Sequence, residues 1–312
     1  MNRILTFNSH TGYHYLLSKT GLDFDVVNWN TDERLIPNNF NLIQLDQAIQ
    51  NIKQNKYDIV LSHKRDDLFF ILRNIKRKSK IRIIYVIHGR YQRSGVSGGA
   101  FHKIAKAGYR QLLKFLSKLY NLELVFITPA VKVSWELNGF VITPGIDIND
   151  FAESSMSLNK LLVVGNNLHR HYFNFDFLKN ISKSIPLSVV GYNPYIENCN
   201  KAKNFLDLLG YYKTHKAFLY LANEPEEGFN LSLLEAMASG LPVITMFHPT
   251  SPIIHNYNGF VAYSENEYMD YCKQLLQDET LAKKLGHNVR ETVKIYFSIN
   301  EFVRKWRYVI EK

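Results

Sequence analysis

The sequence predicts an α/β protein made of two doubly wound domains. Short apolar segments of strand length alternate with amphipathic segments of helix length along the whole chain. This alternation restarts after a polar stretch at residues 145–158 that lacks hydrophobic periodicity. The length of 312 residues is about twice that of a common domain. Because strand–helix–strand units form parallel sheets, we expect two parallel sheets, each covered by helices.

The first half of the chain is expected to supply one sheet and its helices. Its apolar runs, such as IRIIYVI, are rich in β-branched residues and too short for buried helices. The predicted strands are 4–7, 24–29, 58–62, 81–87, 122–127 and 140–142, and the predicted helices are 12–20, 44–55, 65–78 and 100–120.

The second half repeats this pattern with a second set of elements. No fixed-period repeat and no low-complexity tract interrupts it. The predicted strands are 160–165, 186–191, 216–222 and 241–246, and the predicted helices are 168–184, 231–239, 265–277 and 279–295. In doubly wound sheets, ligands bind at the carboxyl ends of the strands, so we expect functional residues there.

Composition excludes several classes of protein. The 46% hydrophobic and 21% charged content excludes a disordered or fibrous chain. Two cysteines, Cys199 and Cys272, are too few for a disulfide scaffold or a Cys-rich zinc site. His10 and His14 lack an acidic third ligand nearby in the sequence, so we expect no metal site. No apolar run is long enough to span a membrane, and the N-terminus lacks the apolar stretch of a signal peptide. We therefore expect a cytoplasmic protein.

Nearly all of the net charge of +10 belongs to the first half of the chain. Residues 1–150 contain 21 basic and 12 acidic residues, whereas residues 151–312 contain 17 and 16. Between Lys64 and Lys118, 15 basic residues are opposed by two acidic ones. Such an excess favours an anionic partner, which could be a nucleotide, a membrane surface or a nucleic acid.

One basic helix and one glycine-rich loop lie within this stretch. Helical spacing places Lys103, Lys106, Arg110 and Lys114 on one face and Phe101, Leu112, Phe115, Leu116 and Leu119 on the other. The basic face is either a solvated surface or a face for an anionic acceptor or the inner membrane surface. The loop at 89–99 carries Arg90 and Arg93, and is either a plain surface loop or a loop that closes on an acceptor.

The segment EPEEGFNLSLLEAMASGLPVIT at 224–245 has the most informative pattern. It predicts a strand end, an acidic loop and then a helix that begins near Asn230 or Leu231. Gly228 allows the backbone to approach a ligand closely. The first N–H groups of such a helix form a favourable site for a phosphate. Glu235 would lie about one turn inside the helix.

This segment resembles the motif of retaining GT-B glycosyltransferases of family 4, or group 1, which act on nucleotide sugars. The family has two Glu residues separated by seven positions, within E-G-F-G-x-x-x-x-E-A-M-A-x-G-x-P-V. Glu227 and Glu235 occupy the acidic positions, and EAMASGLPV matches almost letter for letter. Further resemblance runs through most of the chain, at Gly12, residues 21–26, His88, residues 141–147 with Phe151, and Asn258-Gly-Phe260.

The resemblance implies a GT-B fold, with two Rossmann-like domains and a ligand cleft between them. Residues 1–150 would bind the acceptor and residues 151–298 the nucleotide sugar, and a last helix at 299–312 would return to the first domain. It also implies that Glu227 and His88 are catalytic residues that contact the donor sugar or leaving group. No metal or cofactor is implied, since helix dipoles and cationic side chains can balance the diphosphate. The implied donor-binding residues are Gly12, Arg170, Gly228, Phe229, Asn230, Leu231 and Glu235.

The sequence departs from the family pattern at two places. Asn230 stands where the family has Gly, which would narrow the site or change the sugar. In the loop after the first strand of the second domain, Asn166 replaces an Arg and His171 falls at a Lys position. Arg170, beside it, is our candidate for the diphosphate cation, with a solvated surface cation as the alternative.

The implied function is retaining transfer of a sugar from a UDP- or GDP-type donor to a cell-envelope glycan or glycolipid. The alternatives are a glycosyltransferase that modifies DNA, a nucleotide-sugar epimerase of the same fold, and a pseudoenzyme that only binds the donor. No recognised nucleic-acid-binding motif is present, which makes nucleic acid the less favoured partner. The basic face would allow peripheral contact with the membrane.

Overall fold

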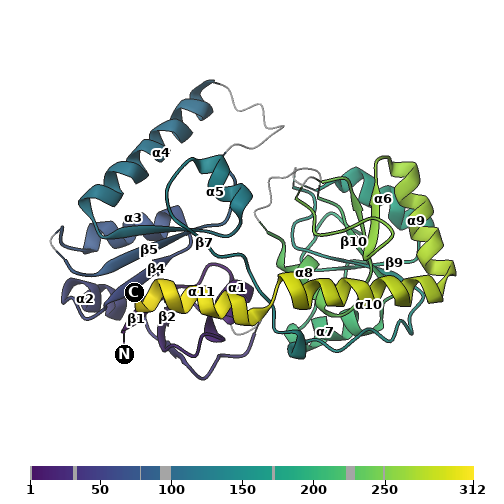
Figure 1. The fold of residues 1–312 in the computed structure, drawn as a ribbon, viewed down its shortest axis with the longest axis horizontal. Coiled ribbons are helices and arrows are strands. Elements are labelled where there is room, and N and C mark those ends of the chain that lie inside the picture. The colour runs from purple at the N-terminus through teal and green to yellow at the C-terminus, as the bar shows by residue number, and fades with distance from the viewer. Residues whose placement is uncertain are drawn as a thin grey trace. The chain divides into compact units, whose positions relative to one another are not determined.

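The chain folds as two compact units in the computed structural model, which describes residues 2–30, 34–77, 79–91, 100–170, 173–222, 229–248 and 250–312, with backbone alone for 100–106 (Figure 1). The N-terminal unit comprises Met1–Pro144 and Asn300–Lys312, and the C-terminal unit comprises Gly145–Ile299. The first unit therefore ends six residues before the predicted position at 150. Residues after Pro144 join the second unit because the Ile146 N–H donates to the Phe297 carbonyl at 2.8 Å.

The N-terminal unit contains a seven-stranded parallel sheet. Its strand order is β3-β2-β1-β4-β5-β6-β7, so the direction of winding reverses between β1 and β4. The strands are β1 (Ile4–Phe7), β2 (Phe24–Val27), β3 (Phe40–Leu42), β4 (Ile59–Ser62), β5 (Arg82–Ile87), β6 (Leu122–Phe126) and β7 (Phe140–Val141). β1 and β4 are buried along their whole length, as central parallel strands must be.

Helices cover this sheet on both faces (Figure 1). They are α1 (Thr11–Ser18), α2 (Leu45–Lys53), α3 (Arg65–Asn74), α4 (Ala100–Leu119), α5 (Pro129–Trp135) and α11 (Ile299–Glu311). β3 and α5 were not predicted. β3 has three residues and only Phe40 is buried, so it carries almost no hydrophobic pattern. The local signal for α5 was present, since Thr128 accepts from the Val131 N–H at 3.1 Å and Pro129 occupies the first turn.

The C-terminal unit contains a five-stranded parallel sheet of order β12-β11-β10-β8-β9. Its strands are β8 (Leu161–Val164), β9 (Leu187–Val190), β10 (Ala217–Tyr220), β11 (Val243–Met246) and β12 (Gly259–Ala262). Its helices are α6 (Phe175–Ser184), α7 (Phe205–Thr214), α8 (Leu231–Ala238), α9 (Glu265–Gln277) and α10 (Glu279–Tyr296), with a short 3₁₀ turn at Ile148–Asp150.

The C-terminal unit differs from the prediction at three elements. α7 and β12 were not predicted, and α6 begins at Phe175 rather than at residue 168. A turn replaces the predicted first residues of the helix, since the Arg170 N–H donates to the Asn167 carbonyl at 3.0 Å. Asn174 then caps α6 by accepting from the Phe177 N–H at 3.2 Å.

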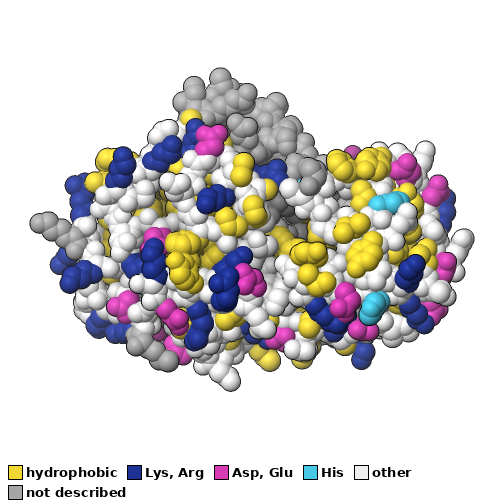
Figure 2. Space-filling view, viewed as in Figure 1, with side chains coloured by type: hydrophobic (Ala, Val, Ile, Leu, Met, Phe, Trp, Pro, Cys, Tyr) yellow, Lys and Arg dark blue, Asp and Glu magenta, His cyan; other side chains and the backbone are white. Residues whose placement is uncertain are grey.

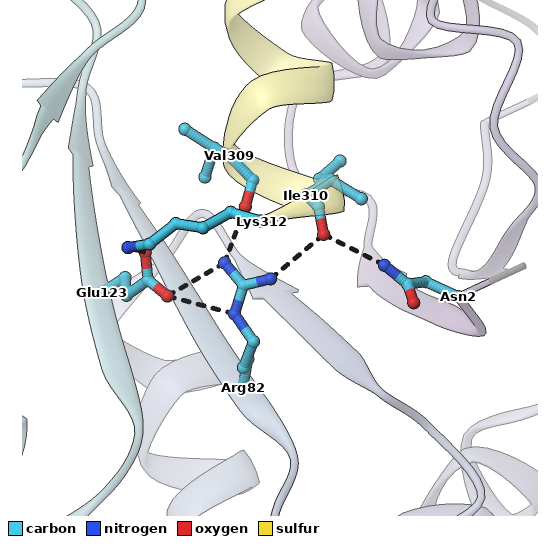
Figure 3. A network of polar contacts seen from close by, with 6 residues as sticks. All are labelled: Asn2, Arg82, Glu123, Val309, Ile310 and Lys312. Atoms are coloured by element: carbon cyan, nitrogen blue, oxygen red, sulfur yellow. Dashed lines mark hydrogen bonds and ion pairs between the residues drawn. The ribbon is translucent and has the colours of Figure 1, made fainter.

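The C-terminal helix α11 belongs to the N-terminal unit and is held there by both apolar and polar contacts. It buries Phe302, Trp306, Val309 and Ile310. Figure 3 shows Arg82 of β5 reaching the end of the helix, where its guanidinium donates to the carbonyls of Val309 and Ile310 at 2.6 and 3.0 Å. The same guanidinium pairs with Glu123 of β6 at 2.9 Å, and Asn2 donates to the Ile310 carbonyl at 3.0 Å. These bonds satisfy carbonyls that a helix end leaves without partners.

On the face of the N-terminal unit that Figure 2 shows, Lys and Arg side chains are interspersed with acidic and apolar ones. Within the described residues, none of the helices has the length and apolar character needed to cross a membrane.

Candidate functional site

Three histidines lie at the carboxyl edge of the N-terminal sheet. His63 directly follows β4 and His88 directly follows β5, while His10 lies three residues after β1. β1, β4 and β5 are neighbours in the sheet, and the winding reverses between β1 and β4. A reversal of this kind opens a crevice in which doubly wound folds bind ligands. The predicted site residue His88 is therefore at a position suited to binding.

A fourth histidine, His14 of α1, completes a compact cluster. The His63 Nδ1 and His88 Nε2 atoms are 3.0 Å apart, which is a hydrogen bond. Ring centroids are 4.4 Å apart for His14 and His63, and 4.9 Å apart for His10 and His88. We call His10, His14, His63 and His88 the histidine cluster. Among the residues that the structure describes, no group of three His, Cys, Asp or Glu side chains is arranged to hold a metal ion.

Burial keeps the inner members of the histidine cluster neutral. Burial lowers the pKa of His14 to about 4, with a smaller opposing effect from its bond to the His10 carbonyl. Burial also lowers the pKa of His63 and His88 well below the ordinary value, and the neighbouring imidazoles lower it further. A neutral imidazole both donates and accepts a hydrogen bond, so these side chains can orient one another.

Tyr13 of α1 connects the histidine cluster to α11. Its ring contacts His63 and His88 edge to face, with centroids 5.4 and 5.0 Å apart. On α11, Phe302 packs against the same ring at 5.7 Å. The returning helix therefore supports the cluster from behind. Gly12 lies beside Tyr13 in the first turn of α1.

The loop after β5 is tied to α5. The Trp135 Nε1–H donates to the Gly89 carbonyl at 2.8 Å, and the Tyr91 N–H donates to Ser134 at 3.0 Å. Arg90 lies between these anchors, and partial burial lowers the pKa of its guanidinium. Arg93 lies outside the described residues.

The basic face predicted for α4 is only partly correct. Arg110 is not a free surface cation, because it pairs with Glu136 at 2.6 Å and lies over the Tyr91 ring. Lys114 is exposed, as predicted. The side chains of Lys103 and Lys106 lie outside the described part of the structure.

The apolar face of α4 also differs from the prediction. Leu116 is buried as expected, but Leu112, Phe115 and Leu119 are exposed by 36%, 56% and 37%. Leu113, which was not assigned to either face, is fully buried instead. The rotation of α4 about its axis therefore exposes an apolar strip, which consists of Leu112, Phe115 and Leu119.

In the C-terminal unit, Asn230 and Leu231 form the start of α8 as predicted. Asn230 is the N-cap, and its side chain accepts from the Leu233 N–H at 3.2 Å and from the Ser232 hydroxyl at 2.6 Å. Ser232 also lies 3.1 Å from the Val164 carbonyl at the end of β8. The Asn that replaces the family's Gly thus has a structural role as a cap. Phe229, just before it, packs against Phe297 at 5.5 Å.

Glu235 is buried within α8, with 8% of its surface exposed. Its Oε2 accepts from the Tyr212 hydroxyl of α7 at 3.1 Å. Burial of a carboxylate is unfavourable unless hydrogen bonds compensate it, and the Tyr212 hydroxyl supplies such a bond to Glu235. Sequence reasoning missed Tyr212 because α7 itself was not predicted. It also missed His63, although a His directly after a buried strand could have indicated it.

The loop after β8 explains the second departure from the family. Asn166 accepts from the Tyr192 N–H at 2.7 Å and thereby joins the loops after β8 and β9. Asn193 strengthens the connection, accepting from the Leu168 N–H at 2.8 Å and donating to the Gly165 carbonyl at 2.8 Å. Arg170 is exposed in this turn.

The remaining predicted residues cannot be placed. Glu227 and Gly228, like His171, lie outside the described residues. Their roles therefore stay predictions from the sequence.

Part of the C-terminal unit matches a known protein family. Residues 201–292, which include α7, α8 and Glu235, match the family described as "Glycosyl transferases group 1". Over this segment of the C-terminal unit, the chain is therefore similar to group 1 glycosyltransferases. The matched region extends well beyond the motif at 224–245 and so confirms the resemblance seen in the sequence.

Two curated relatives resemble part of this chain. The poly(ribitol-phosphate) α-N-acetylglucosaminyltransferase of Staphylococcus aureus (strain COL) is 30% identical over 121 residues, which is 36% of this chain and 24% of the relative. The GtfA subunit of the UDP-N-acetylglucosamine–peptide N-acetylglucosaminyltransferase of Streptococcus agalactiae is 27% identical over 131 residues, 36% of this chain and 25% of the relative. The matches thus span about a quarter of each relative.

The structural likeness covers the whole chain. Anabaena HepE, solved in complex with UDP-glucose, has a TM-score of 0.75 and 14% identity, with full coverage of both chains. At this identity the likeness establishes the fold, which is GT-B, as predicted from the sequence. Each unit has the parallel sheet and flanking helices that this fold requires.

Proposed function

We propose that this protein is a retaining glycosyltransferase that takes a sugar from a UDP-type nucleotide donor. The observation that carries the proposal is the α8 segment, in which a capped helix start and a buried, hydrogen-bonded Glu235 occur inside the region that matches the family. The start of a helix favours the diphosphate, and a carboxylate can accept from two neighbouring ribose hydroxyls. Glu227 is proposed to bind the donor sugar.

The donor base and sugar are proposed from the relatives. One curated relative is named for UDP-N-acetylglucosamine, both are named as N-acetylglucosaminyltransferases, and HepE was solved with UDP-glucose. UDP-N-acetylglucosamine is therefore the first donor to test, with UDP-glucose and a GDP-sugar as comparisons. Retention of the anomeric configuration rests on the family resemblance.

The acceptor is proposed to be an anionic cell-envelope glycan or glycolipid bound by the N-terminal unit. The basic excess of the first half of the chain suits a polyanion, and one relative is named for poly(ribitol-phosphate). Arg90 and Lys114 are described cations on this unit that could contact it.

The exposed apolar strip of α4 supports a further proposal, that the acceptor is bound at a membrane surface. Leu112, Phe115 and Leu119 present apolar surface beside Lys114 and Lys118, a pattern that suits an anionic lipid surface. Phe115→Asp should abolish sedimentation with phosphatidylglycerol vesicles. The matched control is Phe247→Asp in the C-terminal unit, where the side chain is exposed by 57% compared with 56% for Phe115. Equal sedimentation of both variants would reject the membrane face.

The decisive test of function is donor binding followed by product analysis. Titration calorimetry with UDP should give a binding constant that Glu235→Gln weakens about tenfold or more, because hydrogen bonds to a charged group are strong. The control Glu279→Gln changes an exposed carboxylate on α10 and should bind UDP like the parent. Equal binding by the parent and Glu235→Gln would remove Glu235 from the donor site.

Product analysis separates the alternatives. Transfer of N-acetylglucosamine to a poly(ribitol-phosphate) acceptor, with the anomer assigned by NMR, supports the proposal. Change of the donor's own sugar without an acceptor would indicate an epimerase, and UDP binding without turnover would indicate a pseudoenzyme. Transfer to duplex DNA would identify the DNA-modifying alternative.

A further inference from the structure

The contact between His63 and His88 restricts where their protons lie. The Nδ1 of His63 and the Nε2 of His88 are joined by one hydrogen bond of 3.0 Å, so one nitrogen donates and the other accepts. His63 Nε2 is buried and has no partner in the described part of the chain. If His88 donated, neutral His63 would carry its proton on Nε2, as a buried N–H without an acceptor.

The opposite direction avoids this unpaired donor. Buried N–H groups without a partner are rare in folded proteins, and they are rarer than acceptors that go unused. His63 then carries its proton on Nδ1 and donates it to His88 Nε2. Because His88 Nε2 accepts this hydrogen bond, it carries no proton, and the His88 ring is therefore neutral. Its one proton is then on Nδ1.

The neighbours of His63 hold its ring in place for this bond. His63 is 5% exposed, and its ring contacts the rings of Tyr13 and His14. His14 itself is fixed, because its Nδ1 donates to the His10 carbonyl at 3.1 Å and its Nε2 accepts from Thr6 at 3.0 Å. In contrast, His88 is only half-buried, and its Nδ1 has no partner among the described residues.

We propose that His63 is a positioning residue that holds His88 as a neutral imidazole with its proton on Nδ1, so that His88 donates an N–H to an oxygen of the bound sugar or diphosphate. The placement of both histidines after adjacent strands, at the reversal of the sheet, supports this role. The identity of the ligand rests on the proposed function, whereas the position of the proton does not.

The proton position can be measured on the full chain without any substrate. Nitrogen-15 NMR of histidine-labelled protein at pH 7.5 distinguishes protonated from unprotonated ring nitrogens, and the spectrum of His88→Asn assigns the His88 signals. We expect a protonated Nδ1 and an unprotonated Nε2 for His88. A proton on Nε2 would overturn the proposal, whatever the enzyme's activity.

Two substitutions at His63 test the consequence for turnover. His63→Asn keeps a side-chain N–H near the position of Nδ1, and should retain transfer within about threefold of the parent. His63→Leu removes the donor and should lower kcat about tenfold, because a tenfold effect corresponds to the loss of about one hydrogen bond. The affinity for UDP should be unchanged. His287→Leu changes an exposed histidine on α10 and is the matched control.

The outcomes distinguish this proposal from the proposed function. Equal loss of kcat in His63→Asn and His63→Leu, with both variants as stable as the parent, would overturn the positioning role. If His63→Leu does not fold, the NMR result on the parent still decides the proton position. If the parent transfers no sugar but NMR finds the proton on Nδ1, the proposed function fails and the proton assignment stands.

Discussion

Replacing Arg82 with Met should destabilise the N-terminal unit by about 3 kcal/mol. Arg82 donates to Glu123 from two nitrogens, at 3.1 and 2.9 Å, and to the carbonyls of Val309 and Ile310 (Figure 3). Removal of one partner from a buried ion pair costs about 3–5 kcal/mol, because the other charge is left buried. The side chains of Arg82 and Glu123 are each 18% exposed, and Lys312 remains 3.4 Å from Glu123, so the lower value applies.

This loss can be followed selectively in the N-terminal unit. Trp29, Trp135 and Trp306 all belong to it, so tryptophan fluorescence reports its unfolding alone. With an m-value of about 2 kcal/mol per molar, Arg82→Met should lower the urea midpoint by about 1.5 M. The matched control is Arg304→Met, which removes an exposed ion pair within α11 and should leave the midpoint unchanged. A midpoint of Arg82→Met equal to that of Arg304→Met would refute the argument that this network holds α11 in place.

Three further predictions concern stability. Asn230→Ala should lower the unfolding free energy of the C-terminal unit by about 1 kcal/mol through loss of the α8 cap, measured by urea denaturation followed by circular dichroism; an unchanged midpoint would contradict the capping role. Gly191→Ala should prevent stable folding of that unit, since φ is 134° and the added Cβ would lie 2.2 Å from the Gly165 carbonyl oxygen; a parental melting temperature would exclude this clash. The folded-state pKa of His14 lies below its unfolded value, so the associated stability is complete above pH 6.5 and is lost as pH falls toward 4. From this group we expect the unfolding free energy of the parent to be about 2 kcal/mol lower at pH 5 than at pH 7. In His14→Gln this difference between the two pH values should be smaller. If it is the same in the parent and in His14→Gln, the argument is wrong.

Much of the fold could be predicted because its signals are local. All ten predicted strands are present, with ends that differ by at most two residues, since buried parallel strands appear as short apolar runs. The missed elements, β3, β12, α5 and α7, are short or lack a clean hydrophobic period. The motif around Glu235 was also local, because consecutive residues build the start of α8.

By itself, the sequence therefore determined three things: the succession of most strands and helices along the chain, the two-domain α/β class and the family motif. Only the tertiary structure decided which side chains meet. His63 and His88 are 25 residues apart, and Glu235 and Tyr212 are 23 apart, yet each pair shares a hydrogen bond. Arg110 appeared on a continuous basic face but is paired with Glu136. Helical and strand periodicity fix which residues share a face of one element, whereas strand order and the rotation of each helix against the sheet determine what that face contacts.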